Sequence, residues 1–227
     1  MQLRYERKYL VPEDQTSQLA GLLNLHPACF REVYPPRFVN SIYFDDPQCT
    51  NWQQSEEGFC HRRKIRIRWY GALQGTIREP RLEIKSKQGH LGRKTLFPMS
   101  QFTMGSTMDM LHIKEIINGS DIPKGIRHLM QLYTPSLMNR YHRTYLLSAD
   151  GHYRLTIDRN ITYFPLTSHF AHIGTGMTDP ITTVLELKYD RSMDSKAPSI
   201  ARYWPFRLSR KSKYATGMNL TRFALSR

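Results

Sequence analysis

Acidic residues are scarce in this sequence, and a run of apolar residues long enough to cross a membrane is missing. Asp and Glu number 19 against 33 Lys and Arg, so the formal net charge is +14. A chain with this balance favours an anionic partner. Nucleic acid, an acidic membrane surface and a polyanionic small molecule all remain open on charge alone. No stretch approaches the roughly 20 apolar residues that a membrane-spanning helix needs.

Cysteine is also rare. The three cysteines, Cys29, Cys49 and Cys60, are odd in number and show no Cys-x-x-Cys spacing. This pattern argues against a disulfide framework and predicts reduced thiols in a cytoplasmic protein. The first residues are charged from Arg4 onward and contain no apolar signal core, so we expect no secretory leader.

What the sequence does contain is a series of strand-like segments with helical patterns between them. No linker, low-complexity tract or fixed repeat interrupts residues 1–227, which predicts a single α+β domain. The expected strands are 2–11, 29–34, 39–45, 61–71, 81–87, 93–98, 137–147, 152–158, 160–165 and 183–190. The expected helices are 12–25, two short ones between 99 and 135, and 195–204.

The segment 61–71 organises this interpretation. Residues two apart on a strand share a face, so Lys64, Arg66 and Arg68 point one way and the apolar residues between them point the other. Like charges in a row repel, so this face needs solvent or an anion opposite it. A solvated edge, a nucleic-acid patch and the wall of a phosphate-binding cavity all satisfy that need.

Other predicted strands repeat the pattern. Glu-x-Lys occurs at residues 6–8, 83–85 and 186–188, and residues 154–158 alternate Arg, Thr and Asp with apolar residues. Cross-strand salt bridges on a wet face would explain this, at a few tenths of a kcal/mol per pair. If helices cover the outside of a closed sheet, however, the cationic faces must line its interior. Phosphate would then offset the repulsion, because arginine binds phosphate oxygens bidentately. The glutamates would serve as hard oxygen ligands for Mg²⁺ or Mn²⁺.

The segments resemble the VTC (vacuolar transporter chaperone) polyphosphate-polymerase domain, a branch of the triphosphate tunnel metalloenzyme superfamily that includes the CYTH phosphatases. Each segment is weak alone, but eight in order are specific. They cover nearly the whole chain, and are Arg4–Tyr9, Ser41–Asp45, Lys64–Tyr70, Leu82–Lys85, Tyr141–Tyr145, Arg154–Asp158, Leu185–Lys188 and Ser212–Tyr214.

The resemblance implies a closed antiparallel β-barrel of about eight strands that forms a tunnel, with helices packed outside. It implies an enzyme that uses Mn²⁺ or Mg²⁺ to pass the γ-phosphate of ATP to a polyphosphate chain. The implied metal ligand is Glu186, with Glu6 and Glu83 acting through water. The implied catalytic residues are Arg66, Arg68, Arg143, Glu186 and Lys213. The implied phosphate-binding residues are Lys8, Arg66, Arg68, Lys85, Lys94, Arg143, Arg154, Lys188, Ser212 and Lys213.

One departure from the superfamily pattern helps to choose an activity. The CYTH phosphatases begin with Glu-x-Glu-x-Lys, and here the first position is Arg4. Loss of that carboxylate removes part of a hydrolytic metal site and favours a polymerase. A tripolyphosphatase or nucleoside triphosphatase with the same tunnel, and a module that binds polyphosphate without turnover, stay open. We expect no nucleic-acid partner, because the strand glutamates would face the phosphates. The oligomeric state cannot be inferred.

Overall fold

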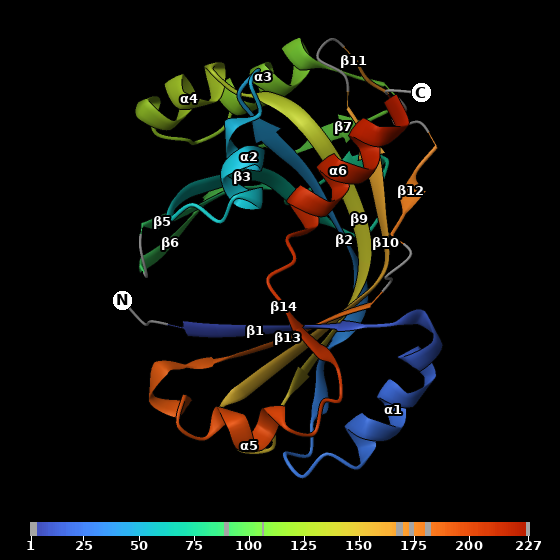
Figure 1. Cartoon of the computed structure of the whole chain (residues 1–227). Coiled ribbons are helices and arrows are strands. Elements are labelled where there is room, and N and C mark those ends of the chain that lie inside the picture. The colour runs from blue at the N-terminus through green and yellow to red at the C-terminus, as the bar shows by residue number, and fades with distance from the viewer. Residues whose placement is uncertain are drawn as a thin grey trace. The chain divides into compact units, whose positions relative to one another are not determined.

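A computed structural model describes residues 4–88, 91–105, 107–166, 170–172, 175–179 and 183–225 (Figure 1). Most of the strands belong to one ten-stranded sheet in which long strands pair with neighbours distant in sequence. In spatial order they are β14 (Arg207–Ser209), β1 (Arg4–Val11), β13 (Thr183–Asp190), β10 (Tyr153–Pro165), β9 (Thr134–Leu147), β2 (Arg31–Asp45), β3 (His61–Tyr70), β5 (Arg81–Gln88) and β6 (Leu91–Pro98), with β12 (Met177–Thr178) beside β10.

The remaining elements are helices and two small sheets. β4 (Gly75–Ile77) pairs with β7 (Phe102–Met104), and β8 (Thr107–Asp109) pairs with β11 (Phe170–His172). The helices are η1 (Glu13–Gln15), α1 (Thr16–Asn24), α2 (Thr50–Glu56), α3 (Met110–Asn118), α4 (Lys124–Gln131), η2 (Arg191–Met193), α5 (Ala197–Ala201) and α6 (Lys213–Leu225).

The prediction of a closed barrel is wrong. Within the described residues the sheet is open, because its strand order begins at β14 and ends at β6 and does not join the two. β14 is only three residues long, and it pairs with residues 8–10 of β1. The prediction came from the family resemblance and from the argument that helices outside a closed sheet would leave the cationic faces in its interior. In the open sheet, glutamates on the same faces contact several of these cations.

By its internal contacts the chain divides into two compact units. Unit 1 comprises residues 1–37, 141–161 and 178–211, and unit 2 comprises residues 38–140, 162–177 and 212–227. The long strands β2, β9 and β10 contribute residues to both units. The organisation as a single domain over residues 1–227 stays a prediction.

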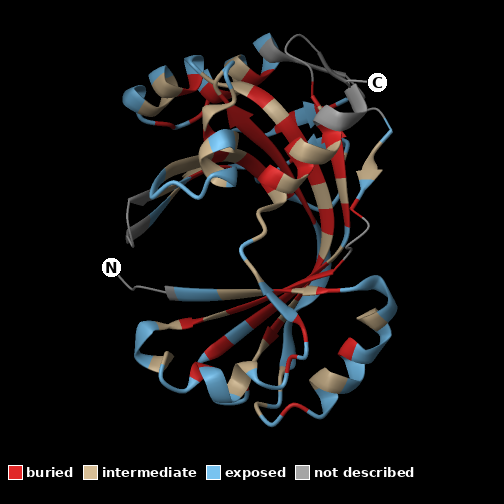
Figure 2. Cartoon of the chain, in the orientation of Figure 1, coloured by how far each residue is buried: buried red, intermediate tan, exposed pale blue. Residues whose placement is uncertain are grey.

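The core of unit 1 lies on one face of β1, β13 and β10. Leu155, Leu185 and Leu187 are fully buried there, and Leu19 of α1 and Ala197 of α5 pack into the same cluster. Burial follows the strands and leaves the outer sides of the helices exposed (Figure 2). The residues between these leucines therefore project from the opposite face. The alternation read from the sequence is confirmed for these three strands.

The core of unit 2 follows the same rule. Ile65, Ile67 and Trp69 of β3 are buried with Leu82 of β5. Ile113 of α3 belongs to the same cluster, together with Ile117 and with Met130 of α4. The two helices predicted between residues 99 and 135 are thus confirmed, and their apolar sides cover this core. The charged residues of β3 and β5 lie on the other face of the strands.

Two pairs of predicted strands are single strands in the structure. β2 runs through Pro35 and Pro36, where the sequence predicts a break. β3 pairs with β2 only from Val39 to Phe44, so both prolines lie outside this paired stretch. Their missing N–H groups therefore remove no hydrogen bond between β2 and β3. β10 likewise continues through Asn160, which adopts a left-handed backbone with φ of 53°.

Candidate functional site

Two groups of charged side chains lie on the polar strand faces, one in each unit. In unit 2, β3 and β5 place Arg66 opposite Glu83, and Lys85 opposite both Lys64 and Lys94. Arg68 shares the face of Arg66 because it follows two residues later on the strand. We call these six residues, Lys64, Arg66, Arg68, Glu83, Lys85 and Lys94, the basic cluster.

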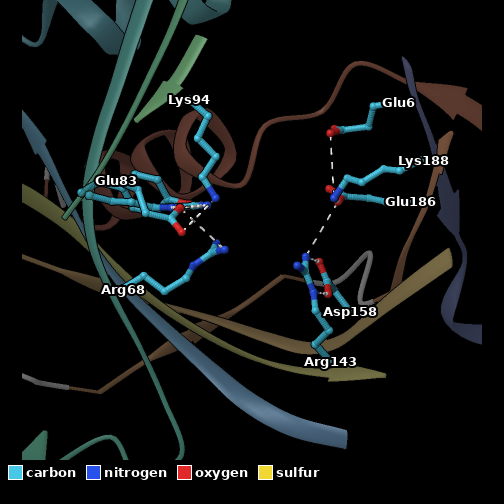
Figure 3. A network of polar contacts seen from close by, with 10 residues as sticks. Glu6, Arg68, Glu83, Lys94, Arg143, Asp158, Glu186 and Lys188 are labelled. Atoms are coloured by element: carbon cyan, nitrogen blue, oxygen red, sulfur yellow. Dashed lines mark hydrogen bonds and ion pairs between the residues drawn. The ribbon is translucent and has the colours of Figure 1, made fainter. Parts of the chain in front are cut away.

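Glu83 is the only acidic member of the basic cluster, and three of its cations contact it (Figure 3). Arg66 donates to Glu83 Oε2 from Nε at 2.8 Å and from Nη2 at 2.5 Å. Lys94 Nζ donates to Oε1 at 3.0 Å, and Arg68 Nη1 lies 3.8 Å from Oε2. Burial alone would raise the pKa of Glu83, but Arg66, Arg68 and Lys94 lower it to about 2. The carboxylate is therefore ionised, and its oxygens are occupied by contacts with cations.

The remaining charge of the basic cluster is not balanced within it. Lys64, Lys85 and Lys94 stand directly opposite one another on three neighbouring strands, an arrangement that costs free energy. The pKa of Lys94 is lowered by burial and by Arg66 and Arg68, and Glu83 only partly offsets this. Burial would raise the pKa of Tyr43, yet Arg66, Arg68 and Lys213 lower it. The lowering for Tyr43, which outweighs burial, indicates a positive potential at this face, whereas burial is the main cause for Lys94.

The start of α6 adds the predicted residues Ser212 and Lys213 to the same unit. Ser212 Oγ accepts a hydrogen bond of 2.6 Å from Lys64 Nζ. Lys213 begins α6, and its charge acts on Tyr43, whose hydroxyl accepts a hydrogen bond of 3.2 Å from Arg66 Nη1. The structure therefore brings these two residues to the basic cluster, as the sequence predicts.

In unit 1, β1 and β13 pair Lys8 with Glu186 and Glu6 with Lys188. Lys8 Nζ lies 2.9 Å from Glu6 and 3.5 Å from Glu186, and Lys188 Nζ lies 2.8 Å from Glu186 and 3.9 Å from Glu6. Each glutamate therefore contacts both lysines. Burial lowers the pKa of Lys8, but Glu186 and Glu6 raise it above its ordinary value.

Arg143 of β9 joins this group through Glu186 and a second acid. Its Nε and Nη2 donate to Asp158 of β10 at 2.5 and 2.7 Å, and Nη2 lies 3.8 Å from Glu186 (Figure 3). Burial would lower the pKa of Arg143, but Asp158 raises it well above its ordinary value. We call Glu6, Lys8, Arg143, Asp158, Glu186 and Lys188 the mixed cluster. Its three carboxylates balance its three cations.

Arg154 is the remaining predicted residue, and it is exposed on β10 in register with Lys188. All the predicted site residues thus lie on polar strand faces or at the start of α6. Lys8, Arg143, Arg154, Lys188, Glu6 and Glu186 belong to unit 1. Arg66, Arg68, Lys85, Lys94, Glu83, Ser212 and Lys213 belong to unit 2.

The donor set can be tested for a divalent metal. Among the described residues no three His, Cys, Asp or Glu side chains gather closely enough to hold an ion. Glu6 and Glu186 do lie together, because both contact Lys8 and Lys188. Two carboxylates fit Mg²⁺ or Mn²⁺ when water and phosphate oxygens complete the coordination. The third predicted ligand, Glu83, is surrounded by three cations instead.

Sequence reasoning missed three participants. Lys64 was placed on the cationic strand face but not in the site, and its contact with Ser212 joins residues 148 positions apart. Asp158 lay in a motif, but nothing in its spacing indicated that it holds Arg143. Tyr43 lay in the Ser41–Asp45 segment, but an alternating aromatic residue is equally typical of a core.

Comparison with known proteins places these features in a family. A family model of the VTC domain matches residues 3–222. A solved structure from Vibrio parahaemolyticus, described as a candidate adenylate cyclase, is similar over 93% of this chain and 95% of its own, with 11% identity and a TM-score of 0.52. The PH1819 protein from Pyrococcus horikoshii OT3 aligns over 97% of this chain and 99% of its own, with 12% identity and a TM-score of 0.48. No curated protein matches the chain.

At 11% identity, the likeness to the Vibrio protein concerns the fold alone. None of the described helices combines the length and the apolar character that crossing a membrane requires.

Proposed function

We propose, from the premise that this chain belongs to the VTC domain family, that it is a metal-dependent polyphosphate polymerase. The proposed reaction transfers the γ-phosphate of ATP to a growing polyphosphate chain. The family match confirms the resemblance read from the eight sequence segments. The match supports a triphosphate or polyphosphate as the substrate. The polymerase activity is a more specific proposal that we add to it.

The observation that carries the proposal is the charge of the basic cluster. The cluster holds five cations and one carboxylate, which three of the cations contact, and three lysines stand in register across β3, β5 and β6. Repulsion between such groups is relieved by an anion that contacts several of them at once. A chain of phosphates provides this, since it presents closely spaced charges and oxygens that arginine can bind in pairs.

In this mechanism the side chains bind and orient, and none acts as a nucleophile. Arg66 and Arg68 are proposed to hold phosphate oxygens in line and to stabilise the charge that spreads over the transferred group. Lys94 and Lys85 bind neighbouring phosphates as point charges. Lys213, at the start of α6, adds a further charge beside Tyr43.

The mixed cluster is proposed to supply the metal ligands, Glu186 and Glu6. A Mg²⁺ or Mn²⁺ ion held there would neutralise phosphate charge. The two lysines that now contact both glutamates would turn to phosphate oxygens. Because only two carboxylates are available, the metal should bind weakly alone and tightly with tripolyphosphate. Titration calorimetry of Mn²⁺ with and without tripolyphosphate tests this without any turnover.

Arg4 favours a polymerase over a hydrolase, because it stands where the CYTH phosphatases carry a glutamate. The deciding experiment incubates the protein with ATP and Mn²⁺ and separates the products by chain length. Polyphosphate of increasing length supports the proposal. Orthophosphate released from tripolyphosphate would instead identify a hydrolase, and tight binding without any product would identify a binding module.

Two variants test whether polyphosphate formation depends on the basic cluster. Arg66→Met should lower polyphosphate formation by at least about a hundredfold, since it removes both a bidentate contact and a charge. Arg202→Met is the matched control, because Arg202 is exposed and its hydrogen bond is to the neighbouring Tyr203. Equal activity of the Arg66 and Arg202 variants would contradict the assignment of the basic cluster.

A further inference from the structure

A buried carboxylate at the end of β2 joins two helices of unit 2. Asp45 has no exposed surface, and its Oδ1 accepts hydrogen bonds from the backbone N–H groups of Asp46 and Asn51 at 2.9 and 3.0 Å. Asn51 Nδ2 and the Trp52 N–H add bonds of 2.8 and 2.9 Å. These bonds fix the beginning of α2 against the strand.

Tyr214 of α6 supplies a further donor to the same carboxylate. Its hydroxyl donates to Asp45 Oδ2 at 2.5 Å and lies 3.1 Å from Ser136 Oγ. Burial and Asp45 raise the pKa of Tyr214 far above its ordinary value, so the hydroxyl keeps its proton and remains a donor. The Asp45–Tyr214 bond connects residues 169 positions apart and involves two buried side chains.

The residues next to Tyr214 are those proposed to bind phosphate. Lys213 is the first residue of α6, and Ser212 precedes it. The Ser212 carbonyl accepts the Thr216 N–H at 2.9 Å, which ties Ser212 to the first turn of the helix. Because Tyr214 lies within that turn, its bond to Asp45 fixes where the turn sits.

The ring of Tyr214 makes a second connection. It stacks on Tyr43 with ring centroids 5.0 Å apart and an interplanar angle of 24°. The hydroxyl of Tyr43 accepts from Arg66, which also binds Glu83. Tyr214 therefore contacts one neighbour of the basic cluster through its ring and another part of the fold through its hydroxyl.

We infer that Asp45 and Tyr214 are positioning residues, which hold Lys213 and Ser212 at the basic cluster. This inference rests on the proposed function, because it assumes that Lys213 contacts the phosphate chain. Neither Asp45 nor Tyr214 would touch the substrate. Their effect on phosphate binding should therefore pass through Lys213 and disappear when Lys213 cannot bind.

A double-mutant cycle tests this inference. Tyr214→Phe keeps the stacked ring and removes only the hydroxyl, and Lys213→Met removes the charge. Binding of inorganic tripolyphosphate is measured by calorimetry for the wild type, both single variants and the double variant. We expect Tyr214→Phe to weaken binding about tenfold in the wild type and less than about twofold in the Lys213→Met background.

The matched control is Tyr153→Phe, which removes a buried hydroxyl that donates to the Met193 carbonyl at 3.2 Å in unit 1. It should lower the melting temperature without changing the affinity for tripolyphosphate. An equal loss of affinity in both Lys213 backgrounds, or no loss at all, would overturn the positioning role. If Tyr214→Phe does not fold, Asp45→Asn probes the same contact from the acceptor side with the same expected cycle.

The outcomes separate this inference from the proposed function. A wild-type protein that does not bind tripolyphosphate refutes the proposed function and the positioning role together. A wild-type protein that binds tripolyphosphate, with a Tyr214→Phe variant that binds equally well, refutes the positioning role alone.

Discussion

The buried ion pair between Arg143 and Asp158 allows a direct test of how much one contact of the mixed cluster contributes to the stability of the protein. Asp158 has no exposed surface, and 11% of the Arg143 side chain is exposed. The pair is bidentate, with Nε–Oδ1 and Nη2–Oδ2 distances of 2.5 and 2.7 Å. Replacing Asp158 by Asn keeps the shape of the side chain and removes its charge. Arg143 then keeps only the more distant carboxylate of Glu186, at 3.8 Å, among the acids described here.

The expected loss of stability follows from the free-energy cost of leaving a buried charge without its partner. Breaking such a pair from one side destabilises a protein by about 3–5 kcal/mol, and Glu186 should hold the loss near the lower end. About 3 kcal/mol is a large part of a total stability of about 5–15 kcal/mol. It corresponds to a fall in melting temperature of about 6–12 °C for a chain of this size. Urea unfolding of both proteins measures the difference directly.

The double variant Arg143→Met with Asp158→Leu serves as the control. Replacing a whole buried pair by apolar residues of similar volume is often neutral or stabilising, so its stability should return to within about 1 kcal/mol of wild type. Under the proposed function, this double variant should not form polyphosphate, because Arg143 is absent. A loss below about 0.5 kcal/mol for Asp158→Asn, or a double variant no more stable than the single one, would refute this reasoning.

Three further predictions concern stability and can be checked by urea unfolding. The pKa of Glu83 is lowered from 4.5 to about 2, so its contribution is fully present above pH 4.5 and is lost as the pH falls toward 2. Glu83→Gln should flatten that dependence, and an unchanged profile would contradict the assigned contacts. Burial lowers the pKa of His26, and the contact of Nε2 with the Ile200 carbonyl at 3.1 Å only partly offsets this, while Nδ1 accepts the Ala28 N–H at 3.0 Å. Its contribution is therefore present above about pH 6.5 and declines below it, and His26→Gln should remove this decline. Thr156 Oγ1 is buried without a hydrogen-bond partner among the described residues, so Thr156→Val should stabilise the protein by about 1 kcal/mol. Destabilisation by that substitution would indicate that the hydroxyl has a partner.

Alternation along the strands was readable from the sequence because it depends only on neighbouring residues. The apolar residues that it placed on one face of β3, β5, β10 and β13 are buried, although several polar residues of the other face, such as Glu83, Asp158 and Glu186, are buried as well. The closed barrel was not readable, because closure depends on whether two strands distant in sequence pair with each other. Closure was expected from the family resemblance, and the sequence did not show that Glu83 and Glu186 each contact several cations.

The C-terminal helix α6 was missed, and with it the contacts of Tyr214. Its buried residues Tyr214, Ala215, Met218 and Thr221 follow helical spacing, but Gly217 and Asn219 between them weaken the pattern. Gly217 has a packing reason, since a Cβ atom there would lie 2.4 Å from side-chain atoms of Leu137 and Tyr163. Such a close approach between a helix and strands depends on residues distant in sequence, so the local sequence does not predict it.

The two clusters differ in how their charges are compensated, and this difference bears on function. In the mixed cluster, acids and cations are equal in number. In the basic cluster, Glu83 offsets part of the repulsion between Arg66, Arg68 and Lys94. Under the proposed function, the same carboxylate competes with phosphate for these three cations. A second acid there would make the free protein more stable and the proposed phosphate complex weaker. One carboxylate among five cations is, on that proposal, the arrangement expected of a face that folds without a ligand and still binds a polyanion.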